Sequence, residues 1–202
     1  MTLVEEVVLK SLGTVPYPAA LQSMQTFTST RTEATPDELW LLEHPPVYTL
    51  GQAAKIPAVA NGIPLIQSDR GGEITYHGPG QAVLYTLVDL ARRGVKVKAF
   101  VRLLEQSVID LLDGRGERRA GAPGVYIGGA KIAALGIRVR RGRAYHGLAL
   151  NVDMDLAPFA AIDPCGYPGL AVTQMKDLGF AQSTNIAGKK LAKIFMKNLG
   201  DA

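Results

Sequence analysis

The chain has 202 residues, of which 47% are hydrophobic and 20% are charged, and its formal net charge is +4 at pH 7. This is the composition of a globular protein, and a chain of this length can bury one sizeable core. Its single cysteine excludes an internal disulfide bond and suits a reducing compartment.

The first residues, MTLVEEVVLKSLG, hold two glutamates and no basic region ahead of an apolar run, so we expect no secretory signal. The longest stretch without a charged residue, Ser11–Thr30, is rich in Ser, Thr, Gln and Pro, which is unlike a membrane span. We therefore expect a soluble cytoplasmic protein with one catalytic domain over residues 1–202.

The first half of the chain predicts one helix among short strands. The helix begins near Pro18, because Tyr17, Leu21, Met24 and Phe27 recur near helical spacing. Strands are expected at Leu3–Leu9, Leu39–Leu42, Val47–Leu50 and Gln81–Leu90.

The second half predicts two helices and two hairpins. The segment Lys96–Gly114 carries an apolar helical face and a terminating glycine, and a second helix is expected around Leu191–Gly200. Gly128-Gly129 and Arg141-Gly142 are turn candidates. They would join strands at Val125–Ile127, Lys131–Arg140 and Ala144–Val152. This pattern favours an α/β fold of the α+β type, with a mixed or antiparallel sheet covered by helices.

Two stretches do not look like ordinary core. RGGEITYHGPGQ, Arg70–Gln81, is either a turn-rich loop or a ligand-binding loop, because glycines let a backbone approach a ligand closely. In GGAKIAALG, Gly128–Gly136, Lys131 stands among small and apolar residues. Such a strand lysine usually lies at an edge or points to solvent, but a partly buried one is suited to proton transfer.

A third stretch, DPCGYPG, holds the only cysteine, Cys165. A lone cysteine is more often a buried apolar residue than a nucleophile. Here its proline and glycine neighbours predict a rigid turn, and the N–H of Gly166 is a candidate oxyanion donor. A nearby ammonium would favour the thiolate. Lys131 is the first candidate for this role, with His77 and His146 as alternatives. The spacing of one cysteine and three histidines makes a metal site improbable.

Together these stretches resemble the lipoyl(octanoyl) transferases, the lipoate–protein ligase B family. The matching segments are HPPVYTLG at 44–51, RGGEITYHGPGQ at 70–81, GAPGVYIGGAKIAALGIRVRRG at 121–142, YHGLALNVDMDLAPFAAIDPCGYPG at 145–169 and VTQM at 172–175. The resemblance implies a mixed central sheet with a smaller second sheet and surrounding helices, as in lipoate ligases and biotin protein ligases.

The resemblance also implies residue roles. Cys165 would be the acyl-thioester nucleophile, and Lys131 the partner that lowers the thiol pKa and carries protons. His146 is kept as an auxiliary candidate. Acyl-binding positions would be Arg70, Gly71, Gly72, Glu73, Ile74, Thr75, Tyr76, His77, Ala134, Leu135, Gly136, Gly147, Leu148 and Ala149.

The implied reaction carries octanoyl from octanoyl-acyl carrier protein to a lysine of lipoyl domains, in 2-oxoacid dehydrogenase subunits and the glycine cleavage H protein. We expect no cofactor, no nucleic acid partner and no membrane partner. The basic run Arg138–Arg143 is either a solvated hairpin end or a contact for an acidic carrier protein. The alternatives are an ATP-dependent lipoate or biotin ligase on the same fold, and a catalytically silent acyl-binding protein.

Overall fold

The computed structural model describes residues 6–55, 61–162 and 169–202. Within them, the strand order of a six-stranded sheet is β1 (Val7–Thr14), β2 (Asp37–Glu43), β6 (Gln81–Asp89), β9 (Arg143–Asn151), β8 (Ala130–Arg140) and β7 (Gly124–Ile127). A three-stranded sheet has the order β4 (Leu65–Gln67), β3 (Val47–Leu50) and β5 (Ile74–His77). The helices are α1 (Tyr17–Thr30), α2 (Leu90–Arg93), α3 (Val97–Leu111), α4 (Thr184–Gly200) and the 3₁₀ segments η1 (Ala157–Ala161) and η3 (Lys176–Leu178).

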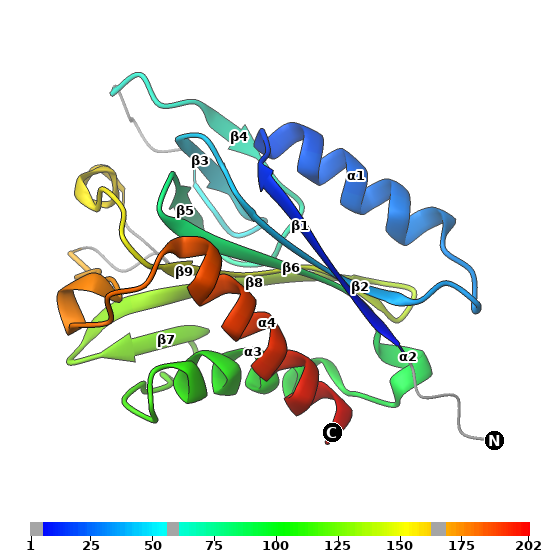
Figure 1. Ribbon diagram of the computed structural model, residues 1–202. Helices are drawn as coiled ribbons and strands as arrows, with labels where there is room; N and C mark the ends of the chain where they lie inside the picture. The colour runs from blue at the N-terminus through cyan, green and yellow to red at the C-terminus, as the bar shows by residue number, and fades with distance from the viewer. Residues whose placement is uncertain (1–5, 56–60, 163–168) are drawn as a thin grey trace.

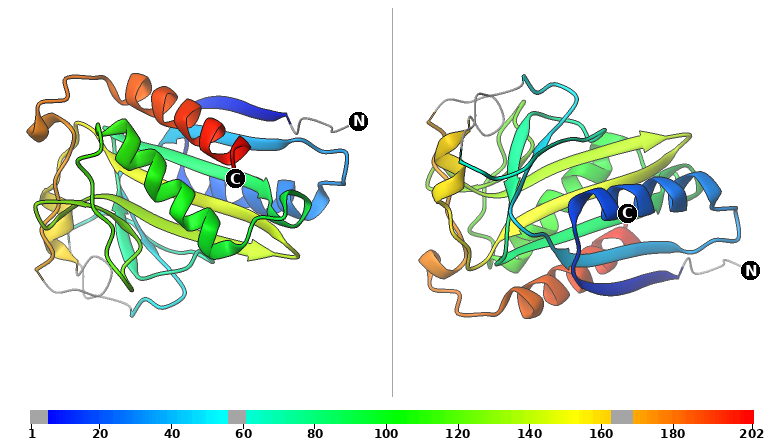
Figure 2. Two further views of the ribbon diagram at one scale, coloured as in Figure 1. Left: turned by 90° about the horizontal axis from the view of Figure 1, so that it is seen from below. Right: turned by 90° about the horizontal axis from the view of Figure 1, so that it is seen from above.

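Helices cover both faces of the six-stranded sheet. In Figures 1 and 2, α3 and α4 lie across one face, and α1 lies on the other, beside the small sheet. In the ranges that the structure describes, no helix is long and apolar enough to cross a membrane.

Strand residues alternate between two hydrophobic clusters. Leu39 and Leu41 of β2 belong to the cluster with α3 and α4, whereas Trp40 and Leu42 belong to the cluster with α1. This alternation follows from the two-residue period of a strand, and it requires apolar residues on both sides of β2. The central strands are therefore hydrophobic almost throughout.

The expected mixed sheet with a smaller second sheet is confirmed: β1 pairs with β2 and β3 with β4 in parallel, and the remaining ladders are antiparallel. The predicted bounds of the α1 helix and of the β2, β3, β6, β7, β8 and β9 strands agree with the structure to within a few residues.

Two boundary predictions were wrong, and two strands were missed. The first strand was expected to end at Leu9 but continues to Thr14. Its exposed second half pairs only with β2 at the sheet edge, so no hydrophobic pattern marks it in the sequence. The last helix begins at Thr184, two turns earlier than expected, where Ser183 accepts a hydrogen bond from the N–H of Ile186. The strands β4 and β5 were not predicted, because β4 is largely exposed and β5 lies within the glycine-rich stretch Arg70–Gln81 that was expected to be a loop.

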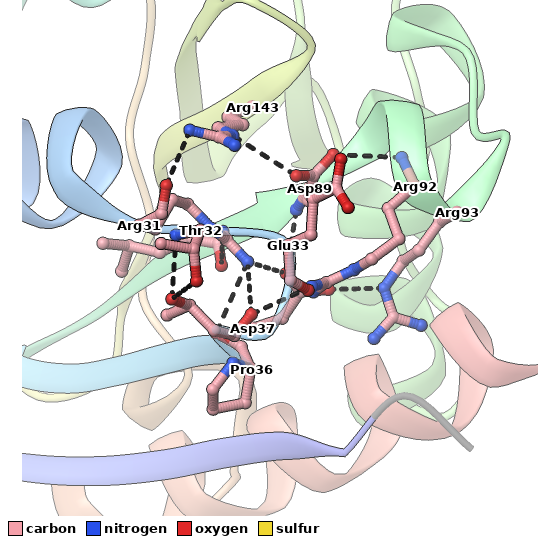
Figure 3. Close-up of polar contacts among 11 residues, drawn as sticks. Arg31, Thr32, Glu33, Pro36, Asp37, Asp89, Arg92, Arg93 and Arg143 are labelled. Atoms are coloured by element: carbon pink, nitrogen blue, oxygen red, sulfur yellow. Dashed lines mark hydrogen bonds and ion pairs between the residues drawn. The ribbon is translucent and has the colours of Figure 1, made fainter. Parts of the chain in front are cut away.

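A buried ion-pair network ties together the ends of five elements (Figure 3). The fully buried carboxylate of Asp37 accepts hydrogen bonds from Arg31 at 2.6 Å, Arg92 at 2.7 Å and Arg93 at 2.6 Å. Arg143, at the start of β9, donates to Asp89 at the end of β6 and to the carbonyl of Arg31. The network thereby joins α1, β2, β6, α2 and β9.

Candidate active site

A cavity of about 650 Å³ lies between the middle of the six-stranded sheet and the glycine-rich segment before and within β5. Its lining includes most of the positions singled out from the sequence: Arg70, Gly71, Gly72, Glu73, Ile74, Thr75, His77, Ala134, Leu135, Gly136, His146, Gly147, Leu148 and Ala149. Tyr76 instead packs with Tyr48 and Phe159 in the cluster of the small sheet. The acyl-binding role of these residues stays a prediction.

Glycines make room for the cavity wall. A Cβ on Gly147 would lie 2.1 Å from the carbonyl oxygen of Leu84, so only glycine fits between β9 and β6 here. A Cβ on Gly136 would lie 3.0 Å from the carbonyl oxygen of Gly71. This closeness lets the N–H of Gly71 donate to the carbonyl of Ile137 at 3.0 Å, which fastens the glycine-rich segment onto β8.

Arg70 braces that segment from within. Its side chain donates to the hydroxyl and carbonyl oxygens of Thr49 on β3, at 2.6–3.2 Å, and to the carbonyl of Gly71 at 3.0 Å. Since the residue is only 8% exposed, its charge is held against backbone and hydroxyl oxygens rather than solvent. Arg70 thus shapes the cavity wall as well as lining it.

Lys131 is buried, with 4% of its surface exposed, which differs from the usual solvent-facing strand lysine. Its ammonium lies 5.3 Å from the ring centroid of Tyr126. A Cβ on Gly124 would lie 2.5 Å from Cε and 3.1 Å from Nζ of Lys131, so the lysine side chain crosses directly over this glycine. Because Gly124 pairs with Ala134 of the cavity wall, the ammonium reaches the level where that wall begins.

The predicted nucleophile Cys165 and the oxyanion donor Gly166 lie outside the described residues. The chain that follows them runs beside Lys131. The N–H of Lys131 donates to the carbonyl of Ala171 at 2.8 Å, and the N–H of Thr173 donates back to the carbonyl of Lys131 at 3.0 Å. Ala171 is six residues after Cys165 in the sequence.

A set of polar contacts that sequence analysis missed lies beside the cavity. The hydroxyl of Tyr17 donates to Ser68 at 2.6 Å, and His44 Nε2 lies 2.6 Å from the hydroxyl of Tyr85. His77 stacks on Tyr17 with ring centroids 6.0 Å apart. The two partners in each of these hydrogen bonds are more than forty residues apart in the sequence, so no local pattern indicates the contacts.

Burial keeps these histidines neutral at pH 7. It lowers the pKa of His44 to about 4, and the hydrogen bond to the Val15 carbonyl offsets only part of the effect. Burial also lowers the pKa of His77 well below its usual value, and the neighbouring His44 adds to the effect. Both rings can therefore act as neutral hydrogen-bonding groups.

His146 lies at the end of the cavity away from Lys131. It pairs with Ile137 of β8, three residues beyond Ala134, where the Lys131 ammonium lies, which corresponds to about 10 Å along the strand. At that separation His146 is out of hydrogen-bond reach of a thiol held beside the Lys131 ammonium. Its Nε2 instead lies 2.7 Å from Oδ1 of Asp69.

The backbone of His146 has φ of +63°, a left-handed conformation that costs about 1–3 kcal/mol for a residue other than glycine. The conformation interrupts the pairing of β9 with β6 between Gly147 and Ala144. The hydroxyl of Thr86 replaces the lost partner by donating to the His146 carbonyl at 3.0 Å. A strained residue held in this way marks a candidate functional position.

The sequence matches the family model described as the lipoyl protein ligase A/B catalytic domain over residues 16–196. A protein of Dechloromonas aromatica named octanoyltransferase is 57% identical over 197 residues, covering 95% of this chain and 96% of its own. An octanoyltransferase of Thiobacillus denitrificans is 62% identical over 177 residues, covering 85% of this chain and 81% of its own.

Solved structures share the fold at low sequence identity. A bi-partite lipoate protein ligase from Thermoplasma acidophilum superposes with a TM-score of 0.75 at 18% identity, covering 96% of this chain and 84% of that one. A biotin protein ligase from Aquifex aeolicus, in complex with biotin and ATP, gives a TM-score of 0.61 at 13% identity, covering 95% and 70%.

Proposed function

The chain belongs to the lipoyl protein ligase A/B catalytic-domain family, and we propose that it transfers octanoyl from octanoyl-acyl carrier protein to a lysine of a lipoyl domain. It is an enzyme, an acyltransferase, in the group of the octanoyltransferases. The proposed acceptors are lipoyl domains of 2-oxoacid dehydrogenase subunits and the glycine cleavage H protein. The proposed setting is the cytoplasm, with residues 1–202 acting as one catalytic domain.

The observation that carries the proposal is the burial of Lys131 next to a cavity whose wall on β8 runs from Ala134 to Ile137. Its ammonium lies at the level of Ala134, and the cavity wall continues along β8 to Ile137. Three strand residues span about 10 Å. An extended chain advances about 1.2 Å per bond, so the seven carbon–carbon bonds of octanoyl span about 8–9 Å. An acyl group with its carbonyl beside Lys131 would fill this length.

The proposed mechanism has two acyl transfers through a covalent intermediate. In the first, Lys131 takes the thiol proton of Cys165, or the pair rests as ammonium and thiolate, and the two groups titrate as a coupled pair. The sulfur attacks the carrier thioester, a new carbon–sulfur bond forms, and the carrier thiol leaves with a proton from Lys131.

In the second transfer, the neutral amine of the acceptor lysine attacks the Cys165 thioester. The carbon–nitrogen bond forms, the carbon–sulfur bond breaks, and the proton lost by the amine returns to the Cys165–Lys131 pair. Backbone N–H groups, including that of Gly166, are the proposed oxyanion donors. Thioester to thioester is nearly balanced and thioester to amide is downhill, so this route needs no ATP.

An ATP-dependent ligase remains the alternative on this fold. The ligases with similar structures are under 20% identical and indicate the fold alone, whereas relatives at 51–62% identity carry the name octanoyltransferase. The identity therefore favours transfer from a thioester donor over activation of a free acid.

The test is octanoylation of an apo lipoyl domain, followed by mass spectrometry, with two donors in parallel. Octanoyl-acyl carrier protein without nucleotide should support transfer, and octanoate with ATP and Mg²⁺ should not. Lys131→Met, which keeps the length of the buried side chain, should lower the rate roughly 10²- to 10⁴-fold. Transfer only from octanoate with ATP would overturn the proposal in favour of the ligase.

A further inference from the structure

The backbone of Lys131 is held by residues 171–173 and not by the neighbouring strand β9. Its N–H donates to the carbonyl of Ala171 at 2.8 Å, and its carbonyl accepts from the N–H of Thr173 at 3.0 Å. The ladder between β8 and β9 begins only at Ala133. The place of Lys131 therefore depends on how firmly residues 171–173 are themselves fixed.

A bulge in β8 makes this support more important. The register against β7 skips Ile132, between the partners of Val125 and Tyr126. Because side chains alternate between the two faces of a strand, the extra residue places Lys131 on the same face as Ala134 of the cavity wall. A bulge that redirects a side chain also disrupts the local ladder, so the lysine needs support from another segment.

Asn151, at the end of β9, binds the supporting segment at two points. Its Nδ2 donates to the carbonyl of Thr173 at 3.0 Å, and its own carbonyl accepts from the N–H of Met175 at 3.0 Å. Asn151 is buried, so its amide depends on protein partners for its hydrogen bonds. Thr173 is thus held between Lys131, through its N–H, and Asn151, through its carbonyl.

Gln81 orients Asn151 from the opposite position on β6. Its Nε2 donates to Oδ1 of Asn151 at 3.0 Å, and its Oε1 lies 2.7 Å from Nδ1 of His77. An amide oxygen only accepts hydrogen bonds, so Nδ1 carries the proton and the neutral ring offers Nε2 as an acceptor. The hydroxyl of Thr49, which itself accepts from Arg70, lies 3.4 Å from that Nε2 and donates to it.

These groups form a hydrogen-bond chain that runs in one direction, through Thr49, His77, Gln81, Asn151 and Thr173 to the Lys131 carbonyl. Each member donates to the next, so each amide and the ring have one orientation that satisfies both neighbours. A buried polar network in which every member is paired favours a single rigid arrangement. Because His77 lines the cavity, the chain ties the backbone of Lys131 to the cavity wall.

We propose that Gln81 and Asn151 are positioning residues that hold Lys131 in place beside the cavity by fixing residues 171–173 on its backbone. The proposal rests on the proposed function, in which the Lys131 ammonium must meet the acyl carbonyl. In the described part of the chain, the cavity lining includes neither Gln81 nor Asn151. A displacement of a reacting group by about 1 Å can cost roughly 10²-fold in rate, so their effect should appear in kcat and not in substrate affinity.

The test compares Asn151→Leu and Gln81→Met with the control Asn198→Leu. Asn198 donates to Ser107 and Asp110 where α4 meets α3, and none of these residues lines the cavity. In the first two variants, kcat for octanoyl transfer should fall roughly 10- to 100-fold, while KM for octanoyl-acyl carrier protein stays within about twofold. Asn198→Leu should keep the wild-type kcat. Because Gln81 acts through Asn151, the double variant should be about as slow as the slower single variant.

Amide hydrogen exchange, followed by NMR, measures the support of Lys131 independently of activity. The N–H groups of Lys131 and Thr173 should exchange roughly tenfold faster in the first two variants, and at the wild-type rate in Asn198→Leu. Gln81→Met decides the matter if Asn151→Leu fails to fold.

Unchanged exchange rates would overturn the proposal, and so would faster exchange with a wild-type kcat, because the contacts would then be structural only. Effects on kcat that add in the double variant would contradict action through one chain. If the wild type itself fails to transfer octanoyl from acyl carrier protein, the proposed function is contradicted, and the exchange rates alone then decide whether Gln81 and Asn151 position Lys131.

Discussion

Lys131 and Gly124 form a matched pair at the residue scale. The lysine side chain passes so close to Gly124 that any Cβ there would collide with it, and φ of +150° at Gly124 is itself a conformation that favours glycine. Because position 124 has no side chain, the buried side chain of Lys131 has room to reach the edge of the cavity.

The buried histidines predict a loss of stability in acid. His44 has a pKa of about 4 when folded against 6.5 as a free side chain, so the unfolded state binds the extra proton as pH falls below 6.5. The stability that His44 contributes is complete above pH 6.5 and is lost as pH falls toward 4, by roughly 3 kcal/mol.

Urea unfolding at pH 7 and pH 4 measures this effect. His44→Asn should be less stable than the wild type at pH 7 and should lose about 3 kcal/mol less between the two pH values. Equal losses in both proteins would show that His44 does not carry the acid sensitivity.

Sequence reasoning reached the residues whose motifs are local. Lys131 and the glycines of the cavity wall stand in recognisable stretches. His146 was a candidate from its motif, but its contact with Asp69, like that of Tyr145, could not be found this way, because 77 and 76 residues separate the partners.

At the scale of elements, the Asp37 network holds the ends of β2, β6 and β9 together. Burial alone raises the pKa of Asp37, but the N–H of Asp89 and the guanidinium groups of Arg31 and Arg93 hold it below its usual range. The buried carboxylate therefore stays ionised and accepts hydrogen bonds from Arg31, Arg92 and Arg93.

Asp37→Ala should destabilise the fold by about 3–5 kcal/mol, because it removes the buried carboxylate that Arg31, Arg92 and Arg93 share. Lys10→Ala is the control: its partly exposed ion pair with Glu38 should change stability by less than about 1 kcal/mol. The urea denaturation midpoints of the two variants measure this difference in stability. Similar small shifts in both would show that Asp37 contributes no more to stability than the partly exposed Lys10–Glu38 pair.

The elements that were predicted correctly are those that bury a continuous face. α3 has Phe100, Leu104 and Val108 at helical spacing, and all three are fully buried. The exposed half of β1 and the first turns of α4 carry few buried residues, so their bounds depend on tertiary pairing and capping rather than on hydrophobic pattern.

At the scale of the whole molecule, two groups of exposed basic residues are candidates for the carrier contact. The turn after β8, with exposed Arg140 and Arg141, lies ten residues beyond Lys131, or roughly 33 Å along the strand. The second place is beside Lys131: exposed Arg119 lies 4.3 Å from the ring centroid of Tyr126, which Lys131 also approaches. The hairpin end is thus a poor candidate for the carrier contact anticipated from sequence.

An acidic carrier protein should therefore depend on the arginines near Lys131. The variant Arg119→Ser should raise KM for octanoyl-acyl carrier protein and weaken its dependence on salt. Arg141→Ser is the control with the same loss of charge. A larger effect from the control would place the carrier at the hairpin end instead.

The central claim is that the single cysteine holds the acyl group between donor and acceptor. The most direct measurement is the intact mass of the protein after incubation with octanoyl-acyl carrier protein, for the wild type and Cys165→Ala. The account predicts a gain of one octanoyl group on the wild type only, and loss of transfer in the variant. No adduct on either protein, with full transfer by Cys165→Ala, would contradict it.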